Sequence, residues 1–122
     1  MILVDTSVWV DHLQAADRAL VRLLEAREVL THPFVIGELA LGSLRQRELI
    51  GNALRDLPHG PVASDQEVLH FIDRHQLFSF GIGYIDVHLL AAAQLVAGTT
   101  LWTRDKRLRT SAQRMGLAAS EQ

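Results

Sequence analysis

The chain has 122 residues, and its 12 lysines and arginines stand against 14 aspartates and glutamates, for a net charge of −2. Since 48% of the residues are hydrophobic, the chain can bury a core as one domain and is not a disordered polyelectrolyte. The absence of cysteine excludes disulfides, thiolate metal sites and cysteine nucleophiles, and the net charge makes no overall case for nucleic-acid binding.

Targeting segments are not predicted either. The apolar N-terminal stretch is interrupted by Asp5, which argues against a secretory signal, and no later stretch approaches the length of a membrane span. We therefore expect a soluble, cytoplasmic protein with no membrane partner.

Apolar strands and amphipathic helices alternate along the chain. Strands are predicted at residues 2–4, 28–32 and 99–103, with a further short strand at 117–119. Helices are predicted at residues 7–14, 17–28, 33–44, 45–57, 64–76, 84–98 and 105–116. The helix boundaries follow from Thr6 or Ser7, Asp17 and Ser64 as caps, Pro33 in a first turn and Gly98 as a terminator.

This alternation predicts an α/β fold, with a central, mostly parallel sheet flanked by helices in three layers. No linker, internal repeat or low-complexity tract divides the sequence. We therefore predict a single domain over residues 1–122.

Four acidic residues occur where a carboxylate is costly. Asp5 ends the first apolar strand, and Asp105 closely follows the strand predicted at 99–103. Glu38 interrupts an apolar helix, and Asp86 lies in the first turn of another. A buried, uncompensated carboxylate costs several kcal/mol or more, so four such placements call for a common explanation.

A shared metal site is the explanation that the topology suggests. Residues just past the carboxyl ends of parallel strands lie at one edge of the sheet, which groups Asp5 with Asp105. Glu38 and Asp86 lie near the starts of helices entered from that edge. Mg²⁺ prefers oxygen ligands and uses a few carboxylates while keeping several waters. Asp5 and Asp86 are the expected innermost ligands, and Glu38 and Asp105 would complete the shell directly or through water.

The segment from residue 98 onward is basic. We predict that Arg104, Lys106, Arg107 and Arg109 contact the phosphates of a polyanionic ligand, although an ordinary solvated helix face is an equally good interpretation.

Four motifs in order resemble one known family. ILVDTS at the N-terminus, PFVIGELALGSL, YIDVHLLAAA and LWTRDKRL together resemble the PIN-domain ribonucleases, and more closely the VapC-type toxins of prokaryotic toxin–antitoxin pairs. The resemblance spans essentially the whole chain. One departure is Leu108, which occupies a position where the family often has an aromatic residue.

The resemblance implies a PIN-like fold and a Mg²⁺- or Mn²⁺-dependent endoribonuclease. The acidic quartet of the family corresponds to Asp5, Glu38, Asp86 and Asp105 as catalytic and metal-binding residues. Its small hydroxyl positions correspond to Thr6 or Ser7 and to Thr103; we expect Ser7 and Thr103 to donate hydrogen bonds to the metal-binding carboxylates. The implied partners are RNA, a second copy of the chain in a homodimer, and a cognate VapB-like antitoxin.

Other interpretations stay open at this level. A receiver-like signalling domain also holds Mg²⁺ with strand-end aspartates, but it needs a strand-end lysine, and Lys106 follows Asp105 at a helix start. A PIN-type RNA-processing nuclease outside any toxin pair, or an inactive PIN-like binding module, would have the same fold. The leucine-rich helices predicted at 17–28 and 45–57 suggest a dimer interface or an antitoxin groove.

Overall fold

A computed structural model describes residues 1–42 and 47–120 of the chain. The three strands of its sheet, β1 (Ile2–Val4), β2 (Val29–Leu30) and β3 (Thr100–Trp102), run parallel in the order β2-β1-β3. The central strand contributes two fully buried residues, Leu3 and Val4, because helices cover the sheet. The predicted α/β fold with a parallel sheet is confirmed.

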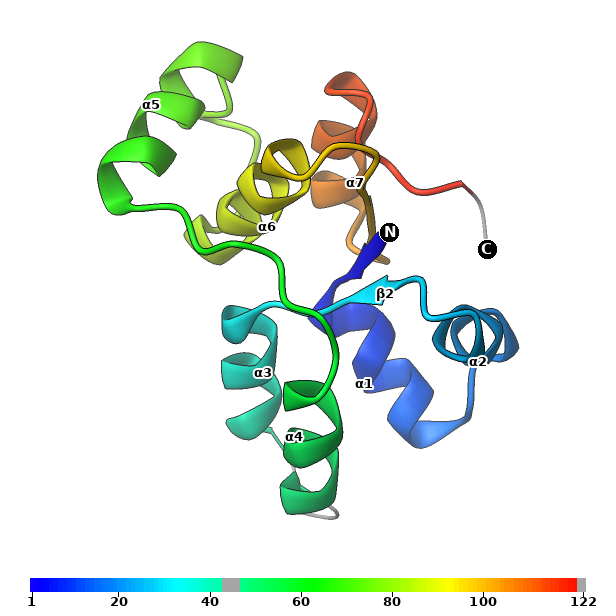
Figure 1. The fold of residues 1–122 in the computed structure, drawn as a ribbon. Helices are drawn as coiled ribbons and strands as arrows, with labels where there is room; N and C mark the ends of the chain where they lie inside the picture. The colour runs from blue at the N-terminus through cyan, green and yellow to red at the C-terminus, as the bar shows by residue number, and fades with distance from the viewer. Residues whose placement is uncertain (43–46, 121–122) are drawn as a thin grey trace.

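Seven helices surround this sheet in the described residues. They are α1 (Thr6–Gln14), α2 (Arg18–Glu25), α3 (Pro33–Ala40), α4 (Arg47–Arg55), α5 (Asp65–His75), α6 (Tyr84–Leu95) and α7 (Lys106–Arg114). Figure 1 shows α5, α6 and α7 in the upper part of the molecule and α1 to α4 in the lower part, with the short strands between them. None of the described helices is long and apolar enough to cross a membrane.

Helix α6 forms the centre of the core. Its residues from Val87 to Ala93 are all buried, and it packs against β3 and α5. A helix that is apolar on nearly every side is stable only when it is covered on nearly every side. Its first turn is therefore held firmly where it approaches the end of the sheet.

Several predicted boundaries differ from the structure. The side chain of Asp5, and not that of Thr6 or Ser7, caps α1 by accepting a hydrogen bond from the Ser7 backbone N–H. Helix α3 ends at Ala40, before the exposed Leu41, and residues 43–44 of its predicted range lie outside the described residues. The predicted strand at 117–119 is reduced to one parallel bridge between Leu101 and Ala118.

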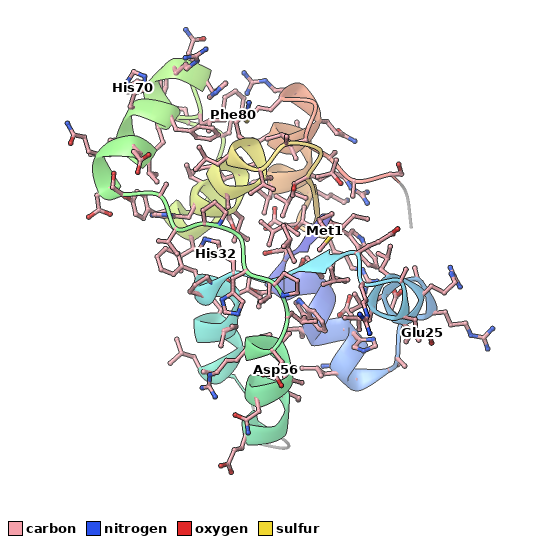
Figure 2. The ribbon with its side chains drawn as sticks, in the orientation of Figure 1. Met1, Glu25, His32, Asp56, His70 and Phe80 are labelled. Carbon is pink, nitrogen blue, oxygen red and sulfur yellow. The ribbon has the colours of Figure 1, made fainter. Side chains whose placement is uncertain are left out.

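Helix α3 begins at a buried histidine. The Nδ1 atom of His32 accepts a hydrogen bond of 3.0 Å from the Phe34 backbone N–H. Figure 2 shows His32 at the start of α3. Burial lowers the pKa of His32 to about 4, assisted by His88 and His59 and opposed by the Pro61 carbonyl. A neutral ring is therefore part of the fold.

We expect acid to destabilise the fold through His32. Above pH 6.5 the ring is neutral both folded and unfolded, but between about 6.5 and 4 only the unfolded chain binds the proton. The free energy of unfolding should therefore fall by about 3 kcal/mol as the pH drops through this window. His32→Asn keeps a cap acceptor without a titrating group. Denaturant titrations from pH 7 to 4 should show a shallower pH dependence for His32→Asn, whereas the exposed control His70→Asn should follow wild type.

Candidate active site

Asp5 is the most buried of the four predicted acids. It follows β1 directly, is 5% exposed, and its backbone N–H bonds to the Trp102 carbonyl of β3. Its Oδ2 atom accepts hydrogen bonds of 2.6 Å from Ser7 Oγ and 2.8 Å from Thr103 Oγ1. These donors stabilise the ionised carboxylate at the place where the ends of β1 and β3 meet.

The two predicted hydroxyl residues, Ser7 and Thr103, connect the start of α1 to the segment after β3 around Asp5. Ser7 Oγ accepts a hydrogen bond from the Arg104 backbone N–H, and Thr103 Oγ1 accepts one from the Asp105 backbone N–H. The segment after β3 is thereby fastened to the start of α1. The positions expected for Ser7 and Thr103 agree with these contacts.

Glu38 reaches this region from near the end of α3, and not from near its start as the sequence suggested. Its Oε1 atom accepts a hydrogen bond of 2.7 Å from Thr6 Oγ1, the residue next to Asp5. Since α1 packs against α3, the first turn of α1 fixes both Asp5 and Glu38. Thr6, which the sequence left undistinguished from Ser7, has its own separate contact.

Asp86 and Asp105 both lie at helix starts. Asp86 Oδ2 accepts a hydrogen bond of 3.0 Å from the Gly83 backbone N–H in the first turn of α6. Asp105 caps α7, because its Oδ1 atom accepts hydrogen bonds from the backbone N–H groups of Arg107 and Leu108. Both carboxylates are placed where the positive end of a helix dipole favours negative charge.

The other three acids lie close enough to Asp86 for their charges to act on it. The pKa of Asp86 is raised, first by burial, and then by the charges of Asp5, Asp105 and Glu38 against the lowering effect of the Gly83 hydrogen bond. The ion pairs of the described residues join Arg104 to Asp11 and Asp17, so none of the four carboxylates is neutralised by a basic side chain there. Among the described residues, the negative charge of the cluster is therefore uncompensated.

The donor set fits a hard divalent cation. Each of the four carboxylates uses one oxygen in the hydrogen bonds described above, and the other oxygen has no hydrogen bond in the described part of the chain. As the described side chains stand, no three acids or histidines converge closely enough to hold one ion together. That arrangement suits an ion such as Mg²⁺, which binds directly to one or two carboxylates and keeps waters in its remaining coordination positions.

The predicted basic residues differ among themselves. The Arg104 guanidinium is already paired, since Nη1 and Nη2 each lie 2.5 Å from a carboxylate oxygen, of Asp11 on α1 and of Asp17 at the start of α2. Lys106, Arg107 and Arg109 are exposed on α7. Arg104 therefore holds the loop before α7 in place, a role that the sequence prediction missed.

Comparison with known proteins decides the family. A sequence model of the PIN domain matches residues 2–113. The chain belongs to the PIN domain family. It is 48% identical over 122 residues to Ribonuclease VapC32 of Mycobacterium tuberculosis strain CDC 1551 / Oshkosh, covering 100% of this chain and 98% of the relative. The VapC32 ribonuclease of strain ATCC 25618 / H37Rv matches with the same identity and coverage.

One PIN-family departure is harmless to the site. Leu108, at the position where the family often has an aromatic residue, is fully buried in the core, while its backbone N–H bonds to Asp105. The hydrogen bond depends on the backbone and is independent of the side chain. The substitution therefore affects packing and leaves the cap at Asp105 intact.

Proposed function

We propose that this PIN-domain protein is an endoribonuclease that requires Mg²⁺ or Mn²⁺, acting as the cytoplasmic toxin of a VapBC-type pair. The observation that carries the proposal is the cluster of four carboxylates near one edge of the sheet, directly after β1, on α3 and at the starts of α6 and α7, which have no basic partner among the described residues. The 48% identity to ribonucleases named VapC32 supports RNA as the substrate and an antitoxin as the partner. The receiver-like alternative is not supported, since Lys106 is an exposed residue of α7.

Each residue of the site has a separate proposed role in phosphodiester hydrolysis. Bound metal supplies an activated water and neutralises charge on the phosphate. Asp5 and Asp86 would be the inner ligands of the metal, and Glu38 and Asp105 would complete its binding site directly or through water and would help to orient the attacking water. Ser7 and Thr103 orient the Asp5 carboxylate through hydrogen bonds of 2.6 and 2.8 Å to its Oδ2 atom.

A metal titration tests this function. Purified protein that has been stripped with chelator should leave labelled single-stranded RNA intact, and cleavage should return with Mg²⁺ or Mn²⁺ but not with Ca²⁺ at equal ionic strength. Cleavage should occur at internal positions of the RNA. Each new end should carry either a phosphate or a hydroxyl group, the same one at every cut. Full cleavage in excess chelator would contradict the proposed metal centre, whereas metal binding without any cleavage would contradict the nuclease.

A groove with both apolar and polar walls is the proposed binding site of the antitoxin. A cavity of about 920 Å³ lies between α1, α3 and α4, and its walls include Val10, Leu13, Ile36 and Glu38. Val10 and Leu13 are exposed there, at 42% and 43%. The groove reaches one of the four acids, so an amphipathic antitoxin segment bound in it could extend a basic side chain to the metal centre.

Helix α2 does not contribute to such a surface as the sequence suggested. Its Leu20 is fully buried, and Leu23 and Leu24 pack partly buried against the core. The exposed apolar residues of the upper helices, Leu69 on α5 and Leu95 on α6, are better placed for the proposed homodimer. Light scattering of the protein and of a Leu69→Asp variant should show a dimer converted to a monomer.

We expect inhibition by an antitoxin to weaken as Mg²⁺ rises. An arginine placed among four carboxylates would pair with them in a bidentate way and compete with the cation. Cleavage should be measured at a fixed antitoxin concentration over a Mg²⁺ series, at constant ionic strength. Replacing the inhibitory arginine with alanine should restore cleavage while the complex stays assembled through the groove. Inhibition that is indifferent to Mg²⁺ would indicate that the antitoxin blocks RNA entry sterically.

A further inference from the structure

The loop between α5 and α6 displays aromatic rings to solvent. Phe78 is 60% exposed and Phe80 40% exposed, and Tyr84 at the start of α6 is 46% exposed. Ser79, between the two phenylalanines, has a φ of 68°, which is uncommon for a residue with a side chain, and Gly81, directly after Phe80, has a φ of 75°. A strained backbone that exposes large apolar rings persists only where neighbouring contacts hold it, and such strain is concentrated at functional sites.

Two arginines of α7 supply those contacts. Arg107 and Arg114 are seven residues apart and so lie on the same face of the helix. The Arg107 guanidinium lies so close to Gly81 that a Cβ atom there would be 2.6 Å from Nη1. The Arg114 guanidinium lies over the Phe80 ring, 4.3 Å from its centre. Figure 2 shows Phe80 in the upper part of the molecule, near α7.

These aromatic rings and arginines lie next to the carboxylate cluster. The backbone N–H of Gly83, at the end of the loop, bonds to Asp86, and the backbone N–H of Arg107 bonds to Asp105. Tyr84 is fixed by a hydrogen bond of 3.1 Å from its hydroxyl to Asp65 and by its edge contact with His88. A polymer that crosses the acids therefore meets the loop and the basic face of α7 next.

We propose that Phe78 and Phe80, with Arg107 and Arg114, form a binding surface for unpaired bases of single-stranded RNA beside the scissile bond. Exposed rings offer faces on which any base can stack, and arginine reinforces such stacking and neutralises phosphates. Bases within a duplex are already stacked, so this surface selects unpaired segments. The inference rests on the proposed ribonuclease function and names the part of the RNA that the site prefers.

Binding can be measured apart from cleavage. In an Asp5→Asn background, which keeps the RNA intact, Phe80→Leu and Phe78→Leu preserve apolar bulk but remove the aromatic face. We expect each to weaken binding of a short fluorescent single-stranded RNA by about 5- to 100-fold, the range for loss of one base stack. An oligomer of the same length with abasic riboses should bind wild type and variants alike. The fluorescence of 2-aminopurine in the RNA should be quenched by the parent protein and not by the leucine variants.

Matched control variants show whether the rings themselves bind the RNA. Val62→Ala removes an apolar residue of similar exposure, 49%, in the segment between α4 and α5 and should leave RNA binding unchanged. The double variant Arg107→Gln, Arg114→Gln should reduce the salt dependence of binding, whereas the phenylalanine variants should not. Equal binding by parent and leucine variants would overturn the proposal. So would a loss of dimer in the leucine variants with RNA affinity retained, because the loop would then join two copies of the chain.

Discussion

Asp5→Asn should abolish RNA cleavage while leaving the metal-free fold at least as stable as wild type. We expect a loss greater than about 100-fold, the upper end of the cost of removing a group that merely supports a metal ligand. The fold should tolerate the change, because asparagine also caps helices well and its carbonyl can accept from Ser7 and Thr103. Removing one charge also relieves the repulsion that raises the pKa of Asp86.

Three measurements check this expectation. Cleavage should be assayed at saturating Mn²⁺, thermal melts recorded in chelator, and the carboxyl titration of Asp86 followed by NMR, where its pKa should fall in the variant. Asp73→Asn, which removes an exposed acid of α5, is the control and should leave all three unchanged. A melt in chelator that placed Asp5→Asn far below wild type would mean that the carboxylate is structural and the metal role is wrong.

Arg104→Ala should lower cleavage by about 10- to 100-fold through the metal centre, the range for loss of a group that supports a ligand. Arg104 lies between Thr103 and Asp105, and its guanidinium joins this segment to Asp11 on α1 and Asp17 at the start of α2. The pairing raises the pKa of Arg104, through Asp11 first, and contributes, after the Leu20 N–H, to the lowered pKa of Asp17. Without it, only the hydrogen bonds to Asp5 and Ser7 hold this segment against α1, so the position of Asp105 relative to Asp5 is less well fixed.

The metal and salt dependences identify which role Arg104 has. If it positions the carboxylates, Arg104→Ala needs more Mn²⁺ for half-maximal rate, and the salt dependence of RNA binding stays that of wild type. If it binds a phosphate, the salt slope falls by about one and the metal requirement does not change. Arg104→Lys should recover only part of the activity, because an ammonium reaches one of the two carboxylates well. Asp11→Asn should reproduce part of the Mn²⁺ effect, which a phosphate contact would not predict.

Local sequence was enough to predict the three strands of the sheet and most of the helix caps, and to propose the acidic cluster. Asp17 and Ser64 cap the helices that were predicted to start there, because capping joins atoms only three residues apart. Asp5 and Asp105 could be placed at one edge of the sheet, since the ends of parallel strands meet there. The same reasoning misplaced the cap of α1, where a strand-end carboxylate serves two purposes: it caps the helix and belongs to the cluster.

Only the tertiary structure decided which side chains support the cluster. The contacts of Thr6 with Glu38 and of Arg104 with Asp11 and Asp17 join residues 32, 93 and 87 positions apart, and no periodicity encodes such pairs. The basic composition near the C-terminus therefore predicted one role for Arg104, Arg107 and their neighbours. In the structure, Arg104 pairs with carboxylates of α1 and of the start of α2, whereas Arg107 packs against the loop between α5 and α6. Hydrophobic pattern and capping fix elements locally, but the partner of a long polar side chain is fixed by where the core brings distant helices together.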